Sequence, residues 1–280
     1  MQAGKPSRTA LGAAGHRAAH QVLEGGRIFS DPLALRIMGG DAELALRDAR
    51  ENPAQAPMRA FVSARSRFAE DALAAAQARG VSQLVVLGAG LDTFAYRAPR
   101  AGLRMFEVDH PDTQTWKRSR LADAGIAAPD NLTYVPVNFE RDTLDERLAA
   151  AGFGRNAQSF FMWLGVTPYL TKDAIWATLG WIGALPAGAH VVFDYGEPRE
   201  AVSDEARAYM QARMERVAAL GEPWISFFEP AALHAKLREL GFRDIEDMRG
   251  GEIGERYLGL PKADTPAVSG GGHILRASTV

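Results

Sequence analysis

The sequence predicts an α/β fold in which helices cover both faces of a mostly parallel sheet. Three observations support this prediction. Short apolar, strand-like runs alternate with helical segments between residues 80 and 195. The first run, residues 84–87, leads into a turn that contains Gly88 and Gly90. Two further strand-like runs lie close together near the end of the chain, and this spacing predicts an antiparallel ending.

Length and composition indicate one large core. The chain has 280 residues, a net charge of −2 and no cysteine, and 47% of its residues are hydrophobic. A chain of this length can bury roughly three quarters of its unfolded surface. The charge gives no indication of nucleic acid or an anionic membrane as partner, and no apolar run approaches the ~20 residues that span a bilayer. No secretory signal is recognisable, so we expect a cytoplasmic protein.

The elements follow in order along the chain. Residues 1–80 are mostly helical and broken at Gly25-Gly26, Asp31-Pro32 and Asn52-Pro53, and the alanine-rich stretch 63–79 favours helix. The first strand follows Gly80, and the second runs over residues 105–109. Later strands are expected at 132–137, 160–164 and 190–195, and helices at 144–151 and from the cap Thr171 to about 185.

The last third of the chain has a different pattern. A helix over 229–240, closed by Gly241, precedes short strands at 245–248 and 273–277. The stretch between these strands is rich in glycine and proline, and we expect no helix there. Five α/β units with an antiparallel ending form the pattern of Rossmann-like class I methyltransferases rather than of the six-stranded dinucleotide-binding fold.

The glycine turn and an acidic residue nineteen positions after Gly90 suggest a nucleoside-containing cofactor. Glycines let a ligand approach the backbone closely, and an acid at the tip of the next strand can accept hydrogen bonds from ribose hydroxyls. Glu107 and Asp109 lie on one face of that strand, and Asp109 is favoured because it is nearer the carboxyl end. Thr93 replaces the third glycine of a dinucleotide fingerprint.

Five strings, in order, resemble the leucine carboxyl methyltransferase-like family, in particular its bacterial small-molecule branch. They are Asp31-Pro32-Leu33-Ala34; Leu87 to Thr93 with Tyr96-Arg97; Glu107 to Pro111 with Trp116-Lys117-Arg118; Trp163 to Thr171; and Val192 to Tyr195. The resemblance implies S-adenosylmethionine as cofactor and a seven-stranded, mostly parallel sheet of order 3-2-1-4-5-7-6. It also implies one domain over 1–280, with a helical cap and lead-in over 1–80, a cofactor-binding half over 81–195, and a lid with the antiparallel ending over 196–280.

The same resemblance implies the site residues. Gly88, Ala89 and Gly90 would flank the methionine part of the cofactor, Asp109 would bind the ribose, and Arg65 would hold the carboxylate. Asn138 and Phe139 would flank the adenine, and Leu164 would lie against the cofactor. Tyr169 would line the site close to the methyl group. Two positions depart from the family pattern, in which Asp is usual at Asn138 and Glu is common at Leu164.

The sequence allows two interpretations of several residues. Arg67 rivals Arg65 as the carboxylate clamp. Tyr96-Arg97 could line the site or form a plain helix face, and Trp224, Phe227 and Phe228 could form an apolar lid or core. His16 and His20 have the spacing of a zinc helix, but Arg17 replaces the usual Glu and no third ligand is evident, so we expect no metal. Residues 1 to about 30 could form a mobile cap hinged at Gly25-Gly26.

The expected reaction is O-methylation of a carboxylate on a small molecule, in secondary metabolism. A carboxylate is ionised at neutral pH and needs no base, whereas a hydroxyl or phenol needs one, and the sequence shows no clear candidate. Alternatives are hydroxyl or phenol O-methylation, a non-catalytic S-adenosylmethionine-binding protein, and a nicotinamide oxidoreductase. The last would require a third glycine and a catalytic Tyr-Lys or His. The sequence gives no indication of the oligomeric state.

Overall fold

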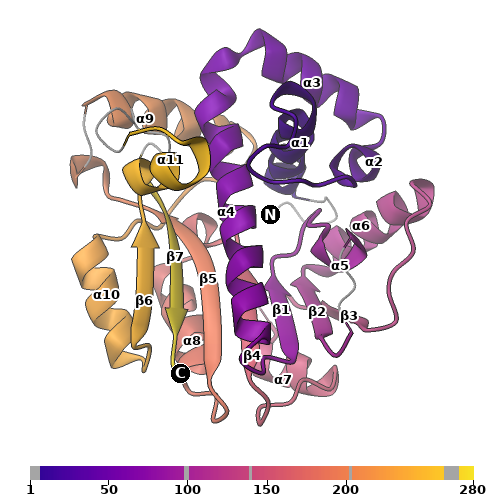
Figure 1. The fold of residues 1–280 in the computed structure, drawn as a ribbon, viewed down its shortest axis with the longest axis vertical. Coiled ribbons are helices and arrows are strands. Elements are labelled where there is room, and N and C mark those ends of the chain that lie inside the picture. The colour runs from indigo at the N-terminus through magenta and orange to yellow at the C-terminus, as the bar shows by residue number, and fades with distance from the viewer. Residues whose placement is uncertain (1–6, 98–100, 139–140, 202–203, 262–270) are drawn as a thin grey trace.

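The computed structural model describes residues 7–97, 101–138, 141–201, 204–261 and 271–280, which form one seven-stranded sheet with helices on both faces (Figure 1). The strand order is β3-β2-β1-β4-β5-β7-β6, as predicted. Strands β1 to β5 are parallel, and β7 pairs antiparallel with both β5 and β6. The bounds are β1 Gln83–Leu87, β2 Arg104–Asp109, β3 Leu132–Pro136, β4 Ser159–Trp163, β5 Ala189–Gly196, β6 Asp244–Met248 and β7 Gly272–Ser278.

The helices lie between these strands and before them. Their bounds are α1 Arg8–Leu23, α2 Ala34–Met38, α3 Asp41–Glu51, α4 Ala56–Gln77, α5 Phe94–Arg97, α6 Pro111–Asp123, α7 Leu144–Ala150, α8 Lys172–Gly183, α9 Asp204–Ala219, α10 Pro230–Glu239 and α11 Gly250–Leu258. Short 3₁₀ turns occur at Pro53–Gln55, Thr167–Tyr169 and Arg199–Ala201. Thr171 accepts a hydrogen bond from Ala174 N and caps α8, as expected.

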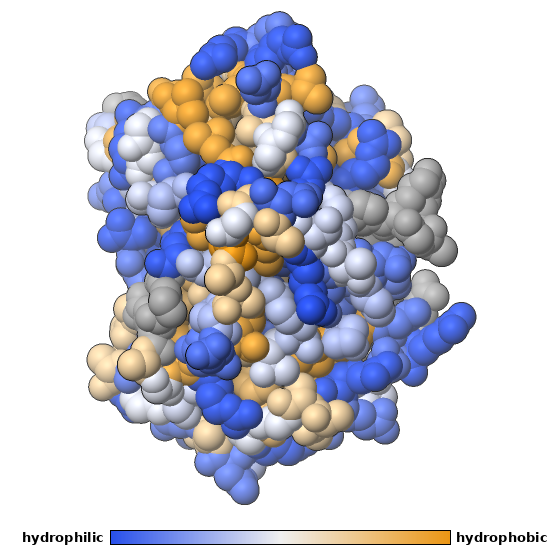
Figure 2. Space-filling model, turned by 90° about the vertical axis from the view of Figure 1, so that its right-hand side faces the viewer, coloured by the Kyte–Doolittle hydropathy of each residue, from blue (hydrophilic) through white to orange (hydrophobic). Residues whose placement is uncertain are grey.

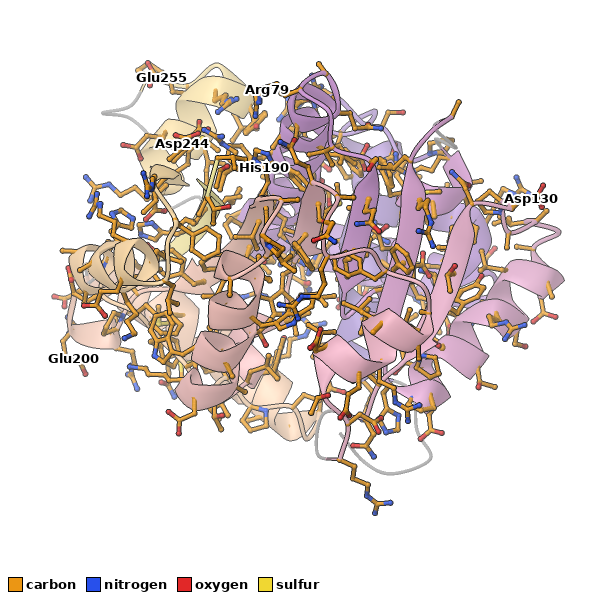
Figure 3. The ribbon with its side chains drawn as sticks, turned by 90° about the horizontal axis from the view of Figure 1, so that it is seen from below. Arg79, Asp130, His190, Glu200, Asp244 and Glu255 are labelled. Carbon is orange, nitrogen blue, oxygen red and sulfur yellow. The ribbon has the colours of Figure 1, made fainter. Side chains whose placement is uncertain are left out.

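The central strands are buried on both faces because alternate side chains enter two separate cores. Leu84 and Val86 of β1 pack in a cluster with Phe68 of α4, whereas Val85 and Leu87 join a cluster that includes Ile175 of α8. Figure 3 shows side chains filling both sides of the sheet. This double burial explains why these strands are continuous apolar runs in the sequence.

The N-terminal helices α1 to α3 lie above the strand ends in Figure 1 and form a third apolar cluster. Ala14 and Ala18 of α1 are fully buried, together with Ile37 and Met38. Figure 2 shows apolar surface gathered in the upper part of the molecule, where these helices lie. Apart from the gaps given above, no helix is both long and apolar enough to cross a membrane.

A buried ionic network fastens the N-terminal segment to the glycine turn. The carboxylate of Asp31 accepts hydrogen bonds from Arg17 Nε at 3.1 Å and from Thr93 Oγ1 at 2.7 Å. Arg17 also donates to the Leu91 carbonyl, and Arg97 donates to Thr93 Oγ1 at 2.8 Å and pairs with Glu70. Two of the strings that carry the family resemblance, Asp31 to Ala34 and Leu87 to Thr93, are therefore far apart in the sequence but in direct contact through Asp31 and Thr93.

The expectation that no helix separates the last two strands is wrong. Helix α11 lies between β6 and β7, and its Ile253 and Tyr257, one turn apart, pack on the α4 side of the sheet. Its glycines, which lower helix propensity, concealed it in the sequence. Gly259 ends the helix in the left-handed conformation. The antiparallel pairing of β6 with β7 is confirmed.

Candidate active site

A cavity of about 1240 Å³ opens at the carboxyl ends of the parallel strands. Residues at or directly after the carboxyl ends of β1, β2, β4 and β5 form its floor, and helices α1, α3, α4 and α9 contribute its walls. Ligands of open α/β sheets bind outside the carboxyl ends of strands, so this cavity is where a cofactor is expected. Leu44 and Ile225, which are 56% and 52% exposed, also line it and make part of its surface apolar.

The turn after β1 requires its two glycines. Gly88 has φ of +64°, and a Cβ built on it would lie 2.4 Å from Val166 Cγ2. Gly90 has φ of +43°, and a Cβ there would lie 3.0 Å from the Cβ of Ala10 in α1. Both glycines and Ala89 line the cavity. The turn thus presents bare backbone to the cavity while α1 packs closely above it.

Asp109 ends β2 beside this turn. One carboxylate oxygen accepts a hydrogen bond from Gly90 N at 2.6 Å, and the other accepts from His110 N at 2.7 Å. Burial raises the pKa of the Asp109 carboxyl, and these two backbone hydrogen bonds oppose that rise. Asp109 lines the cavity and keeps lone pairs that could accept ribose hydroxyls.

Glu107 is only 1% exposed and lies away from the cavity lining. Its carboxylate lies 2.8 Å from Lys117 Nζ and accepts a hydrogen bond from the Tyr96 hydroxyl at 3.1 Å. Burial raises the pKa of Glu107, and Lys117 opposes that rise. Of the two acids on this strand face, the structure places Asp109 in the cavity and Glu107 in the core.

Arg65 of α4 is 7% exposed and lines the cavity. Its Nη1 donates to Asp194 at 2.8 Å, and the other Asp194 oxygen accepts from Gly165 N at 2.5 Å. Arg67 lies on the outer surface, where it pairs with Asp71 at 2.8 Å. The helix register therefore favours Arg65 over Arg67 as the residue that could meet a cofactor carboxylate.

The remaining cofactor candidates are placed as follows. Asn138 and Leu164 line the cavity, and Asn138 N donates to Asp142 at 2.8 Å. Phe139 lies outside the described residues. Leu164 packs beside the apolar cluster that includes α4.

Tyr169 and His16 face the same cavity from opposite walls. Burial raises the pKa of the Tyr169 phenol, while hydrogen bonds with Trp224 and Thr9 and two nearby arginines oppose that rise, so the group is neutral at pH 7. Burial and the charges of Arg213, Arg59, Arg65 and Arg216 lower the pKa of His16 to about 3. The ring is therefore an uncharged and very weak base at neutral pH.

The structure places the residues that had two interpretations as follows. Tyr96 and Arg97 lie outside the cavity lining and belong to the buried networks around Glu107 and Asp31. Trp224 and Phe227 line the cavity, whereas Phe228 packs in the core against Trp176, with ring centroids 5.0 Å apart. His20 donates or accepts toward Glu24 at 3.1 Å, and the described residues contain no cluster of three or more metal-ligating side chains.

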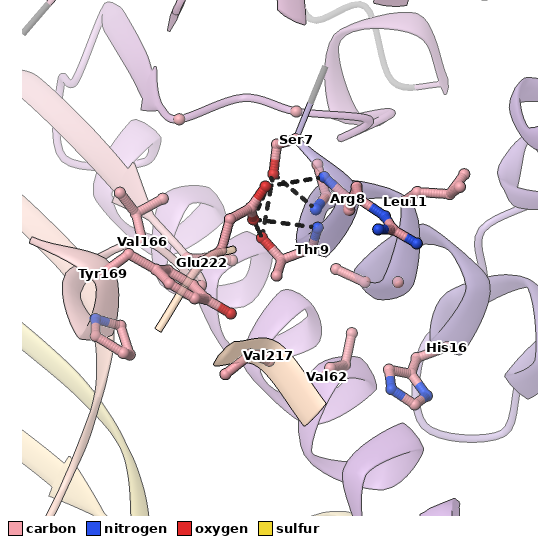
Figure 4. A pocket seen from close by; sticks show the side chains of 18 of the residues that line it. Ser7, Arg8, Thr9, Leu11, His16, Val62, Val166, Tyr169, Val217 and Glu222 are labelled. Atoms are coloured by element: carbon pink, nitrogen blue, oxygen red, sulfur yellow. Dashed lines mark hydrogen bonds between the residues drawn. The ribbon is translucent and has the colours of Figure 1, made fainter. Parts of the chain in front are cut away.

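Sequence reasoning missed three contributors to the cavity. Asp194 lies at the end of β5, where the rule that singled out Asp109 would also have found it. Glu222 follows α9 and accepts hydrogen bonds from Ser7 Oγ at 3.1 Å, Arg8 N at 3.0 Å and Thr9 N at 3.3 Å, and also from Thr9 Oγ1 (Figure 4). Arg213 of α9 also lines the cavity. The resemblance implied a lid somewhere in 196–280, but no sequence pattern indicated a helix at 204–219 or singled out Arg213 and Glu222.

Comparison with known proteins agrees with this geometry. The profile of the leucine carboxyl methyltransferase family matches residues 10–183. YktD of Bacillus subtilis (strain 168), named as an S-adenosyl-L-methionine-dependent methyltransferase, is 31% identical over 207 residues, 73% of this chain and 68% of its own length. A protein of Mycobacterium avium (strain 104) with the same activity in its name is 31% identical over 230 residues, 76% of this chain and 71% of its own length.

Solved structures agree on the fold. A DUF574 family protein from Streptomyces avermitilis matches with a TM-score of 0.54 and 15% identity over 95% of this chain and 97% of its own. A structure described as a methyltransferase from Thermobifida fusca matches with a TM-score of 0.52 and 15% identity over 99% and 96% of the two chains. The chain belongs to the leucine carboxyl methyltransferase family and is an S-adenosylmethionine-dependent methyltransferase.

Proposed function

We propose that this enzyme methylates a carboxylate oxygen of a small molecule, a reaction of secondary metabolism. The observation that carries the proposal is that Tyr169 and His16, which face each other across the described part of the cavity, are both poor bases, while His110, which also lines it, uses its Nδ1 to accept from Asp112 N at the start of α6. Tyr169 is a neutral phenol with a raised pKa, and His16 has a pKa of about 3. A hydroxyl acceptor would need a base to take its proton, and Tyr169 and His16 are poorly suited to that role, whereas a carboxylate is ionised already.

The acidic side chains of the cavity do not fill this role. Asp109 is held by two backbone amides, Asp194 by Arg65 and Gly165, and Glu222 by the first turn of α1. Asp48 pairs with Arg216 at 3.0 Å, and Asp41 pairs with Arg120. Each of these carboxylates is engaged within the described part of the chain, which supports an acceptor that arrives ionised.

The residues present fit S-adenosylmethionine. The bare backbone at Gly88, Ala89 and Gly90 would take the methionine part, Asp109 would accept the ribose hydroxyls, and Arg65 would meet the carboxylate with its planar guanidinium. Asn138 would take the adenine edge, and Leu164 would pack against the cofactor. When bound, the cofactor supplies a methyl group already activated by the sulfonium.

The protein then has to hold the acceptor close and aligned, which can supply a large share of the reduction in barrier. Tyr169, as a neutral phenol in the cavity, would donate a hydrogen bond to the acceptor carboxylate and orient its second oxygen. Trp224 and Phe227 would exclude water on the α9 side. We propose no proton transfer by the protein, because none is needed for this acceptor.

The test is the chemistry of the product. The enzyme is incubated with S-adenosylmethionine labelled in its methyl group and a panel of small carboxylic acids, each beside its alcohol analogue. We expect label only with the acids, in a product that releases labelled methanol in dilute alkali. An alkali-stable product, or label only with the alcohols, would exclude the carboxylate and favour a hydroxyl or phenol acceptor.

A further inference from the structure

Arg213 differs from the other buried cations of the cavity. Arg17 pairs with Asp31 at 3.1 Å and Arg65 pairs with Asp194 at 2.8 Å. Arg213 is partly buried on the α9 wall, and within the described residues it has no ion pair with a carboxylate. A buried charge without a counter-ion is costly, so such a residue indicates a missing partner.

The aromatic side chains around Arg213 hold it in place. Its Cζ lies 5.9 Å from the ring centroid of Tyr209 and 5.5 Å from that of Trp224. Burial lowers the pKa of Arg213, the contact with the Tyr209 hydroxyl opposes that fall, and the neighbouring Arg65 adds to it. The aromatic faces fix the guanidinium but do not neutralise it.

The Tyr209 hydroxyl is a second polar group without a clear partner. It is buried and lines the cavity wall against Arg213, from which its oxygen can accept, and its own proton has no acceptor within the described part of the chain. A buried hydroxyl left in this state costs free energy unless a ligand or water satisfies it. The cavity thus contains the Arg213 guanidinium next to the Tyr209 hydroxyl, and both groups can donate hydrogen bonds to an anion.

No cavity carboxylate is left to fill this position. Each described acidic side chain that lines the cavity has another partner, namely Asp41, Asp48, Asp92, Asp109, Asp194 and Glu222. Arg65 is itself engaged by Asp194 near the glycine turn, so the two arginines serve different places in the cavity.

We propose that Arg213 and the Tyr209 hydroxyl form an anion subsite that binds the carboxylate of the methyl acceptor, separate from the cofactor carboxylate at Arg65. The guanidinium and the Tyr209 hydroxyl would donate to the same carboxylate oxygen that Tyr169 binds, which leaves the second oxygen to take the methyl group. This proposal rests on the proposed function at one point, because it identifies the carboxylate that binds there as the carboxylate of the methyl acceptor. It makes the enzyme selective for acids over their amides or esters.

The probe is benzoate, with benzamide as its neutral counterpart, and binding is followed by tryptophan fluorescence because Trp224 stacks beside Arg213. S-adenosylhomocysteine affinity is measured in parallel by calorimetry. The variants are Arg213→Met, Arg213→Lys and Tyr209→Phe. Arg216→Met is the matched control, since it removes the same charge one turn along α9 from a guanidinium already paired with Asp48.

We expect wild-type protein to bind benzoate more tightly than benzamide. Arg213→Met should weaken benzoate binding by roughly ten- to a hundredfold, and Arg213→Lys and Tyr209→Phe by less. Arg216→Met should change it less than about twofold, the usual size of an exposed ion-pair effect. In all four variants S-adenosylhomocysteine affinity should stay within about twofold of wild type, which also shows that each variant is folded.

Two results would overturn the subsite. One is equal binding of benzoate and benzamide by wild type. The other is a loss of S-adenosylhomocysteine affinity in Arg213→Met with benzoate binding intact, which would place Arg213 in the cofactor clamp. An alkali-stable methylated product would overturn the proposed acceptor alone, because benzoate binding that depends on Arg213 would still establish the subsite.

Discussion

Two acids that lie two residues apart on one strand face have different surroundings because of where the strand ends. Glu107 is inside the sheet, where Lys117 and Tyr96 surround its carboxylate. Asp109 is the last residue of β2, where backbone amides hold its carboxylate and the cavity begins. Strand position thus decides which acid is available to a ligand.

The first prediction concerns Asp109→Ala. A hydrogen bond to a charged group contributes about 1.5–3 kcal/mol, so removing the carboxylate should weaken S-adenosylhomocysteine binding by roughly ten- to a hundredfold. Calorimetry on both proteins measures this. Glu107→Gln is the comparison, because it should lower the free energy of unfolding through the buried Lys117 while leaving cofactor affinity nearly unchanged. Unchanged affinity in Asp109→Ala would remove Asp109 from the site.

The second prediction compares Arg65→Lys with Arg67→Lys. Lysine keeps the charge but loses the planar fork, so Arg65→Lys should weaken S-adenosylhomocysteine binding measurably. Arg67 pairs with Asp71 on the outer surface, with half of its side chain exposed, and its replacement should have no effect on affinity. The opposite outcome, a silent Arg65→Lys with a damaging Arg67→Lys, would assign the carboxylate clamp to Arg67.

At the scale of elements, α1 is held at its first turn and along its middle. Its middle is buried through Ala14 and Ala18, and Arg17 ties it to Asp31. Its first turn is capped by Ser7 and by the carboxylate of Glu222, which follows α9. A carboxylate at a helix N-terminus is favourable for both its hydrogen bonds and the helix dipole. Glu222 thus joins the N-terminal helix to the α9 wall across the cavity (Figure 4).

The third prediction follows from this contact. Glu222→Ala should speed hydrogen exchange at the amides of Arg8, Thr9 and Ala10, while exchange in the second half of α1 stays slow. Mass spectrometry of short peptides measures both. Glu239→Ala, which removes an acid that pairs with exposed Lys236 on α10, is the control. Equally fast exchange along all of α1 would instead support the hypothesis of a mobile cap hinged at Gly25-Gly26, as would ligand-dependent nicking there.

The elements show which parts of the fold were predictable. Strands β1, β4 and β5 are buried on both faces, so each is a continuous apolar run that stands out in the sequence. Helix α11 was missed because three glycines hide a two-residue apolar stripe, and α9 because its charged residues and alanines give no clear apolar face. The glycine turn, Asp109 and Arg65 are local to the predicted strands. Arg213 and Glu222 reach the cavity only through tertiary packing, which no local pattern records.

At the scale of the whole molecule, two buried histidines at different ends of the sheet respond to pH in opposite directions. His190 begins the apolar part of β5 at the end far from the cavity, near Arg79 and Asp244 (Figure 3). Burial and the charges of Arg79 and Arg276 lower its pKa to about 4. At the other end His273 contacts Asp247 at 2.8 Å and Glu197 at 2.5 Å, and these acids raise its pKa against the effect of burial.

The signs follow from the two protonation states. Above pH 6.5 His190 is neutral in both folded and unfolded chains, and as the pH falls toward 4 the unfolded chain takes up a proton that the folded one refuses. Stability is therefore lost on the acid side. His273 is protonated in both states below pH 6.5, and as the pH rises toward its raised pKa only the folded chain keeps the proton. Its contribution is lost on the alkaline side.

The fourth prediction is that replacing each histidine changes one side of the stability profile. A pKa lowered from 6.5 to about 4 corresponds to a loss of about 3 kcal/mol between those pH values, so His190→Gln should make the acid decline shallower by up to that amount. His273→Gln should lower stability at pH 6 and flatten the decline above pH 6.5. Urea unfolding at a series of pH values, with each variant compared to wild type, measures both slopes. His16 titrates equally in all three proteins, whereas Asp247 loses in His273→Gln a partner that lowers its pKa, so only the slope above pH 6.5 is assigned to His273 in that variant. An acid slope that is the same in His190→Gln and wild type would mean that His190 accepts a proton in the folded chain, and that Arg79 and Arg276 do not govern its charge.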